Sequence, residues 1–141
     1  MSGAGLAVID ASVAVKWVLA ETDEDKATAL LQSFADGTIE LIAPQVLLHE
    51  VASTLSKRCR RKDLTSRQAE RAFELFLEKT PVLLDQSIAE ALALALRHQI
   101  SFWDSLYLAL AINQRADLIT ADQRLYRSVS RHYPFVKLLG S

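Results

Sequence analysis

The sequence predicts an α/β fold in which helices cover both faces of a mainly parallel sheet. Two observations predict it: short apolar runs suited to buried strands recur along the chain, and longer segments with helical spacing separate them. The chain has 141 residues, of which 50% are hydrophobic, so we expect a single domain over residues 1–141 with a substantial core.

The predicted strands are apolar runs too short for helices. The first ends abruptly at Asp10, and turn or cap residues bound the others. In chain order, the strands are expected at residues 6–9, 39–43, 82–84, 118–120 and 135–138.

The predicted helices are identified by apolar periodicity and by cap patterns at their first residues. Thr22, Thr65, Ser87 and Ser101 each precede an acidic or amide side chain by three residues, as in a capping box. Pro44 suits the first turn of a helix. The helix that begins after Ser101 is apolar all round, so we expect it to be buried. The helices are expected at residues 11–20, 22–35, 44–62, 65–79, 87–98, 101–112 and 123–132.

Composition narrows the functional classes. The net charge is −1, with 16 basic and 17 acidic residues, so binding of nucleic acid by bulk charge is excluded and any such role needs a local patch. The single cysteine, Cys59, cannot form an internal disulfide, which favours the cytoplasm. No signal peptide is evident, and the apolar segment 88–96 is too short to span a bilayer, so no membrane association is expected.

Four acidic residues occupy positions that an ordinary surface does not explain. Asp10 and Asp122 follow predicted strands, and ligands of parallel sheets bind beyond the carboxyl ends of strands. Asp104 lies in the first turn of the buried helix, and Glu50 flanks an apolar helical stripe. Each also has a structural interpretation: Asp10, Asp104 and Asp122 suit helix caps, and Glu50 suits a solvated helix surface.

A convergence of these acids would require a cation or protonation. Four ionised carboxylates about 5 Å apart would repel by roughly 3 kcal/mol per pair, or about 20 kcal/mol in all, at an effective dielectric near 20. A domain is stable by only about 5–15 kcal/mol. Oxygen ligands favour Mg²⁺ or Mn²⁺, and an ion held in this way supports phosphodiester hydrolysis.

At this point the chain resembles the PIN-domain family, and within it the VapC-type toxin ribonucleases. The matching segments occur in the family's order and read VIDAS at 8–12, PQVLLHEV at 44–51, FWDSLYLALA at 102–111 and LITADQRL at 118–125. One position departs from the pattern: Ser53 stands where many relatives have asparagine.

The resemblance implies a three-layer α/β/α sandwich, Mg²⁺- or Mn²⁺-dependent endoribonuclease activity, a homodimer, and a VapB-like antitoxin that blocks the site. It makes Asp10, Glu50, Asp104 and Asp122 the metal-binding acids. It also implies that the hydroxyls of Ser12 and Thr120 support the first and last of these acids.

Two groups of basic residues are candidates for binding RNA. One is the basic run of Lys57, Arg58, Arg60, Arg61 and Lys62. The other lies on one helix face and has antitoxin carboxylates as its alternative partner; it consists of Arg124, Arg127 and Arg131. The alternative for the first group is a solvated helix end that complements the helix dipole.

Two other functions compete with the nuclease. A haloacid-dehalogenase-type phosphatase would need a second aspartate two positions after Asp10, where this chain has Ser12. A catalytically silent module that only binds RNA or a partner would have little use for four converging acids.

Overall fold

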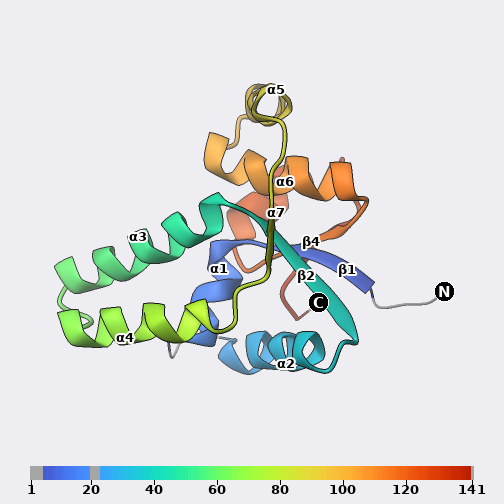
Figure 1. Ribbon diagram of the computed structural model, residues 1–141. Helices are drawn as coiled ribbons and strands as arrows, with labels where there is room; N and C mark the ends of the chain where they lie inside the picture. The colour runs from blue at the N-terminus through green and yellow to red at the C-terminus, as the bar shows by residue number, and fades with distance from the viewer. Residues whose placement is uncertain (1–4, 20–22, 141) are drawn as a thin grey trace.

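The computed structural model describes residues 5–19 and 23–140. Within these residues five strands form one parallel sheet in the order β3-β2-β1-β4-β5 (Figure 1). The strands are β1 (Gly5–Ile9), β2 (Ile39–Pro44), β3 (Val82–Leu84), β4 (Asp117–Thr120) and β5 (Val136–Leu138). The helices are α1 (Ala11–Ala14), the 3₁₀-helix η1 (Val15–Trp17), α2 (Glu24–Ala35), α3 (Val46–Arg60), α4 (Ser66–Leu77), α5 (Ile88–His98), α6 (Phe102–Gln114) and α7 (Gln123–Val129).

Helices cover both faces of the sheet, which confirms the α/β/α layering. In Figure 1, α5 and α6 lie above the sheet and α2 lies below it, while α3 and α4 form a hairpin that projects to one side. The central strands β1 and β2 are apolar and buried toward their carboxyl ends, as Ala7, Val8 and Ile9 of β1 illustrate, because helices cover both faces of the sheet there. In the described segments no helix is both long and apolar enough to cross a bilayer.

Helix α6 is buried around its whole circumference only over its middle. Residues 105–111 are buried, whereas Trp103 near its start is 54% exposed and Ile112 is also exposed. The expectation of an entirely buried helix is therefore wrong at both ends. The middle is enclosed because α6 packs between α5 and the strands β1, β2 and β4.

Several predicted boundaries are corrected by the structure. The helix expected at 11–20 is α-helical only to Ala14 and continues as η1, where the indole Nε1 of Trp17 donates to the backbone oxygen of Ala27 at 2.9 Å. Pro44 does not begin a helix but ends β2 opposite Leu84, and α3 starts at Val46. A proline is tolerated at a strand end because one ladder hydrogen bond fewer is needed there.

Other helix ends differ from their predicted positions by only a few residues. The last helix stops at Val129 rather than at residue 132. The predicted cap at Thr22 lies outside the described residues, and α2 follows Asp23, which has a positive φ of 65° and no side-chain cap hydrogen bond. The capping box of Thr65 and Gln68 is confirmed.

The sheet order creates a switch point beside β1. Successive strands run outward from β1 through β2 to β3, and the chain then crosses to β4 on the other side of β1 and continues to β5. Crevices form where neighbouring connections leave in opposite directions, outside the carboxyl ends of the strands. Asp10 directly follows β1, and Asp122 follows β4 by two residues, so both acids lie at this point.

Candidate active site

The four acids singled out in the sequence line one cavity of about 310 Å³. They come from four separate segments: the ends of β1 and β4, the second turn of α3 and the first turn of α6. The other residues that line this carboxylate cavity are Ala11, Ser12, Val15, Lys16, Thr54, Arg58 and Ala121. The cavity therefore joins a core of carboxylates to two cationic side chains.

Helix capping and membership of the site are compatible. Asp10 accepts from the backbone N–H of Val13 at 3.4 Å, and Asp122 accepts from Arg124 and Leu125 at 2.9 and 3.2 Å. Asp104 is held differently, because its backbone N–H donates to the Ser101 hydroxyl at 3.0 Å. The caps thus hold these three acids at the cavity wall.

Asp10 is the centre of a hydroxyl network. The hydroxyls of Ser12 and Thr120 donate to its two carboxylate oxygens, each at 2.5 Å. Backbone N–H groups then fix the hydroxyls: Ala121 donates to Ser12 at 2.8 Å and Asp122 donates to Thr120 at 3.0 Å. Thr120 therefore touches Asp122 through its backbone and not through its carboxylate.

Glu50 is oriented by a residue that sequence reasoning missed. The phenol of Tyr107, which is 1% exposed, donates to Glu50 Oε1 at 2.6 Å. Burial, followed by the charge of Glu50, raises the pKa of Tyr107 far above its ordinary value, so the phenol remains a donor. The available signal was its position three residues after Asp104, which places both on one side of α6.

Burial dominates the electrostatics of the site. Burial raises the pKa of Asp10 from 3.8 to about 6 against the lowering effect of its two hydroxyl partners, and the charge of Asp104 raises it further. Burial is also the largest cause of the raised pKa values of Glu50 and Asp104, with neighbouring carboxylates adding less. Burial therefore raises these pKa values more than repulsion among the carboxylates does, although repulsion was the effect expected from the sequence.

The carboxylates surround the cavity without forming a closed metal cage. Among the described residues, no three acidic, histidine or cysteine side chains already stand in a metal-binding arrangement. The carboxylates that line the cavity are the oxygen ligands that hard ions such as Mg²⁺ or Mn²⁺ prefer, and Mg²⁺ takes only one or two carboxylates directly while it keeps several water ligands. The donor set is all oxygen, and Asp10 is a buried carboxyl whose ionised form lacks an ion-pair partner among the described residues.

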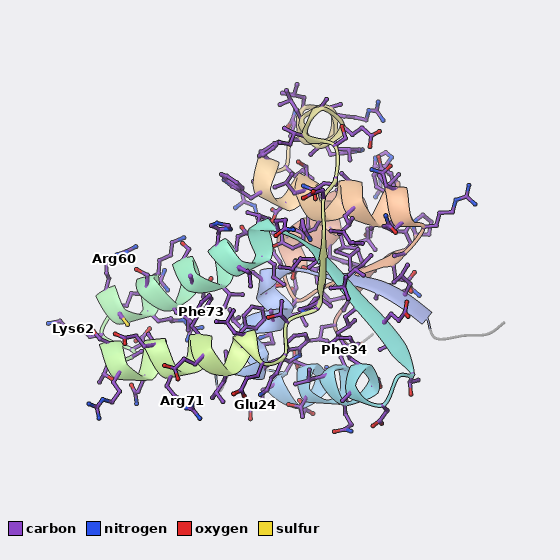
Figure 2. The ribbon with its side chains drawn as sticks, in the orientation of Figure 1. Glu24, Phe34, Arg60, Lys62, Arg71 and Phe73 are labelled. Atoms are coloured by element: carbon purple, nitrogen blue, oxygen red, sulfur yellow. The ribbon has the colours of Figure 1, made fainter. Side chains whose placement is uncertain are left out.

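Only some of the basic residues predicted to bind RNA lie at the carboxylate cavity. Arg58 lines the carboxylate cavity, and the charge of Lys57 lowers the pKa of Glu50. Arg60 and Arg61 instead lie at the far end of α3, as the Arg60 label in Figure 2 shows. Lys16, which the sequence did not single out, lines the cavity.

Three other residues named in the sequence analysis lie outside the carboxylate cavity. Arg124 lines an adjacent cavity, whereas the exposed Arg127 lines neither. Ser53, the departure from the family pattern, is exposed and does not reach the carboxylate cavity. Thr54 lines the cavity instead, with its hydroxyl donating to the backbone oxygen of Glu50 at 3.0 Å.

Comparisons with known proteins agree with this architecture. Residues 7–129 match the PIN domain family. The chain is 35% identical over 123 residues to ribonuclease VapC3 of Pyrobaculum aerophilum, covering 84% of this chain and 90% of the relative.

Solved structures share the fold at lower sequence identity. PAE2754 of Pyrobaculum aerophilum superposes with a TM-score of 0.68 at 22% identity, covering 89% of this chain and 86% of that one. VapC20 of Mycobacterium tuberculosis, a sarcin-ricin loop cleaving toxin, has a TM-score of 0.64 at 16% identity, with 87% and 95% covered. A toxin–antitoxin complex from Klebsiella pneumoniae gives 0.60 at 18%, with 87% and 92% covered. The family match, the VapC3 relative and the common fold together show that this chain belongs to the PIN domain family.

Proposed function

We propose that this chain is a metal-dependent endoribonuclease and the toxin of a toxin–antitoxin pair. One observation carries the proposal: four acids from distant segments line a single cavity at the switch point of the sheet. Asp10, Glu50, Asp104 and Asp122 hold Mg²⁺ or Mn²⁺, directly or through water. When bound, the ion activates water and neutralises charge on the scissile phosphate.

The protein's own side chains have distinct tasks in this proposal. Ser12 and Thr120 fix the orientation of the Asp10 carboxylate, and Tyr107 fixes that of Glu50. Lys16 and Arg58 place positive charge in the wall of the same cavity, where it attracts the phosphates of RNA. Lys57, Arg60 and Arg61 extend this positive charge along α3, and Arg124 and Arg127 are the residues of α7 that contact the RNA.

RNA is the substrate and a VapB-like antitoxin is the partner in this proposal. The curated relative is named a ribonuclease, one structural neighbour is named for cleaving the sarcin-ricin loop, and another is a toxin–antitoxin complex. A site rich in carboxylates and flanked by cations is one that an antitoxin segment can block by ion pairing. The cytoplasm is the compartment that holds such substrates and partners.

We further propose a homodimer formed through the outer face of α5. Ile88, Leu92 and Leu96 recur at four-residue spacing and are exposed, Ile88 by 68% and Leu96 by 72%. Such a stripe on the outermost helix of one layer is typical of an interface (Figure 1). Leu92→Glu should yield monomers in sedimentation measurements, whereas Leu77→Glu, at an exposed site on α4, should not.

The nuclease proposal is tested with purified protein and single-stranded RNA. Cleavage is measured with Mg²⁺, with Mn²⁺ and with EDTA, for the unaltered chain and for Asp10→Asn. We expect metal-dependent cleavage that Asp10→Asn abolishes while the circular dichroism spectrum is unchanged. Asp117→Asn is the matched control. Asp117 begins β4, at the edge of the sheet opposite the cavity, and the variant should cleave RNA normally.

The outcomes separate the competing functions. Equal cleavage by Asp10→Asn would reject the proposed mechanism. Binding of RNA without cleavage in any metal would identify a silent binding module. Release of phosphate from small phosphomonoesters would indicate a phosphatase, although Ser12 donates to Asp10 at the position where that chemistry needs an acid.

A further inference from the structure

A second polar cavity, of about 200 Å³, adjoins the carboxylate cavity. Asp104 and Asp122 line both, so the two cavities lie on either side of a shared wall. The rest of this second cavity comes from the segment between α5 and α6 and from one side of α7. Its other lining residues are Gln99, Ile100, Ser101, Arg124, Leu125 and Ser128. A strand of RNA whose phosphate lies between the acids therefore has a neighbouring unit at the mouth of the second cavity.

The lining of the second cavity combines hydrogen-bonding groups with two apolar side chains. Ile100, which is partly buried, and Leu125, which is buried, form the apolar part of this lining. Among the described residues Arg124 makes no ion pair within 4 Å, although its charge acts to lower the pKa of Asp104, and the Gln99 amide makes no hydrogen bond. The Ser128 hydroxyl donates to the Arg124 backbone oxygen at 2.9 Å and keeps its acceptor capacity.

Charge and size indicate what this cavity accepts. Among the described residues Arg124 is the one cationic side chain that lines it, whereas a phosphate site typically gathers several cationic donors. It is smaller than the cavities of about 300–1,000 Å³ that enclose whole drug-sized ligands, and so suits a single ring system. An uncharged planar group with donors and acceptors on its edge, which describes a nucleobase, satisfies both conditions.

We propose that the second cavity binds the base of the nucleotide next to the cleaved bond, and that Arg124 selects guanine there. The inference rests on the proposed function, because it takes RNA as the substrate. The two parallel N–H donors of an arginine match the O6 and N7 acceptors of guanine, and single-stranded RNA exposes this edge. Gln99 and Ser128 line the same cavity and supply further contacts to the base edge. Arg124 is thus a specificity-determining residue.

The test reads base preference at the cut site. A pool of random single-stranded RNA is digested with Mg²⁺ or Mn²⁺, and the ends of the products are sequenced. We expect guanine to be enriched at one position flanking the cut. Arg124→Lys keeps the charge but loses the paired donors, so the enrichment should fall about tenfold. Arg124→Gln should shift the preference toward adenine, whose N6 and N7 match an amide.

The control is Arg115→Gln, which removes an exposed charge just beyond α6 at a residue that lines neither cavity. It should leave the preference unchanged. Uniform slowing of cleavage at all sequences by Arg124→Gln would overturn the inference and identify a phosphate contact. Cleavage by the unaltered chain without base preference would also overturn it, while leaving the nuclease proposal standing. If no RNA is cut, calorimetric titration with short oligonucleotides that differ only in guanine or adenine content decides the matter, and equal affinity refutes selection.

Discussion

Replacement of Asp10 by asparagine should stabilise the metal-free protein at neutral pH while abolishing cleavage. Asp10 is 5% exposed, and burial raises its pKa from 3.8 to about 6. The folded protein therefore binds this proton more tightly than the unfolded chain does. Stability is fully present below about pH 4 and is lost as the pH rises through 6.

The magnitude follows from the two pKa values. The difference between 3.8 and about 6 corresponds to ~3 kcal/mol of stability lost at pH 7.5 without metal. Asparagine removes the buried charge but forgoes hydrogen bonds to an ionised acceptor, which are worth more than those to an amide. We therefore expect a net gain of about 1–3 kcal/mol.

The hydrogen-bond network can accept the amide. The oxygen of asparagine takes the place of Oδ1 and keeps its bond from Ser12. Its N–H group would meet Thr120, whose hydroxyl must turn away. Thr120 lies 3.3 Å from the Ser12 oxygen, so its hydroxyl can donate there and accept from the amide.

The assay is urea unfolding in EDTA at several pH values, followed by tryptophan fluorescence, which reports on the buried Trp17 and the exposed Trp103. The variant should be more stable than the unaltered chain at pH 7.5, and the difference should shrink toward pH 4. Added Mg²⁺ or Mn²⁺ should stabilise only the unaltered chain, since ligands that bind the folded state raise its stability.

Asp117→Asn provides the baseline, because Asp117 makes an exposed ion pair with Lys137 at 3.0 Å. Its effect should stay below about 1 kcal/mol at every pH. A lower stability for Asp10→Asn than for the unaltered chain in EDTA at neutral pH would refute the view that Asp10 is a buried charge awaiting a cation.

Three other substitutions test the surroundings of the site. Tyr107→Phe removes the donor that orients Glu50 and should lower kcat by about 10–100-fold with little change in RNA affinity, as measured by steady-state kinetics. Thr120→Val removes one of the two hydroxyl donors to Asp10 and the acceptor of the Asp122 backbone N–H, and should cost about 1–3 kcal/mol in urea unfolding. Leu110→Ala empties a fully buried position on α6 and should cost about 2–5 kcal/mol, yet folded protein at low temperature should still cleave. An unchanged kcat for Tyr107→Phe, or an unchanged free energy of unfolding for Thr120→Val, would show that the hydroxyl removed does not support its acid. An unchanged free energy of unfolding for Leu110→Ala would show that the core tolerates the cavity.

Much of the site was predictable because its signals are local. Asp10 and Asp122 stand after apolar runs, and strands end where such runs end. The cap patterns at Thr65, Ser87 and Ser101 were correct because a cap depends on residues only three positions apart. The same locality explains the error at Pro44, where pairing with β3 outweighs the preference of proline for a first helical turn.

Neighbouring residues were enough to predict the alternation of strands and helices, the burial of their central residues and the acids at strand ends. They were not enough to predict that β1 lies between β2 and β4, which brings Asp10 and Asp122 together. The tertiary structure also decided that Tyr107 reaches Glu50, 57 positions away, and that burial outweighs repulsion among the acids. These features depend on contacts between segments far apart in the chain, and no local pattern specifies which segments will meet.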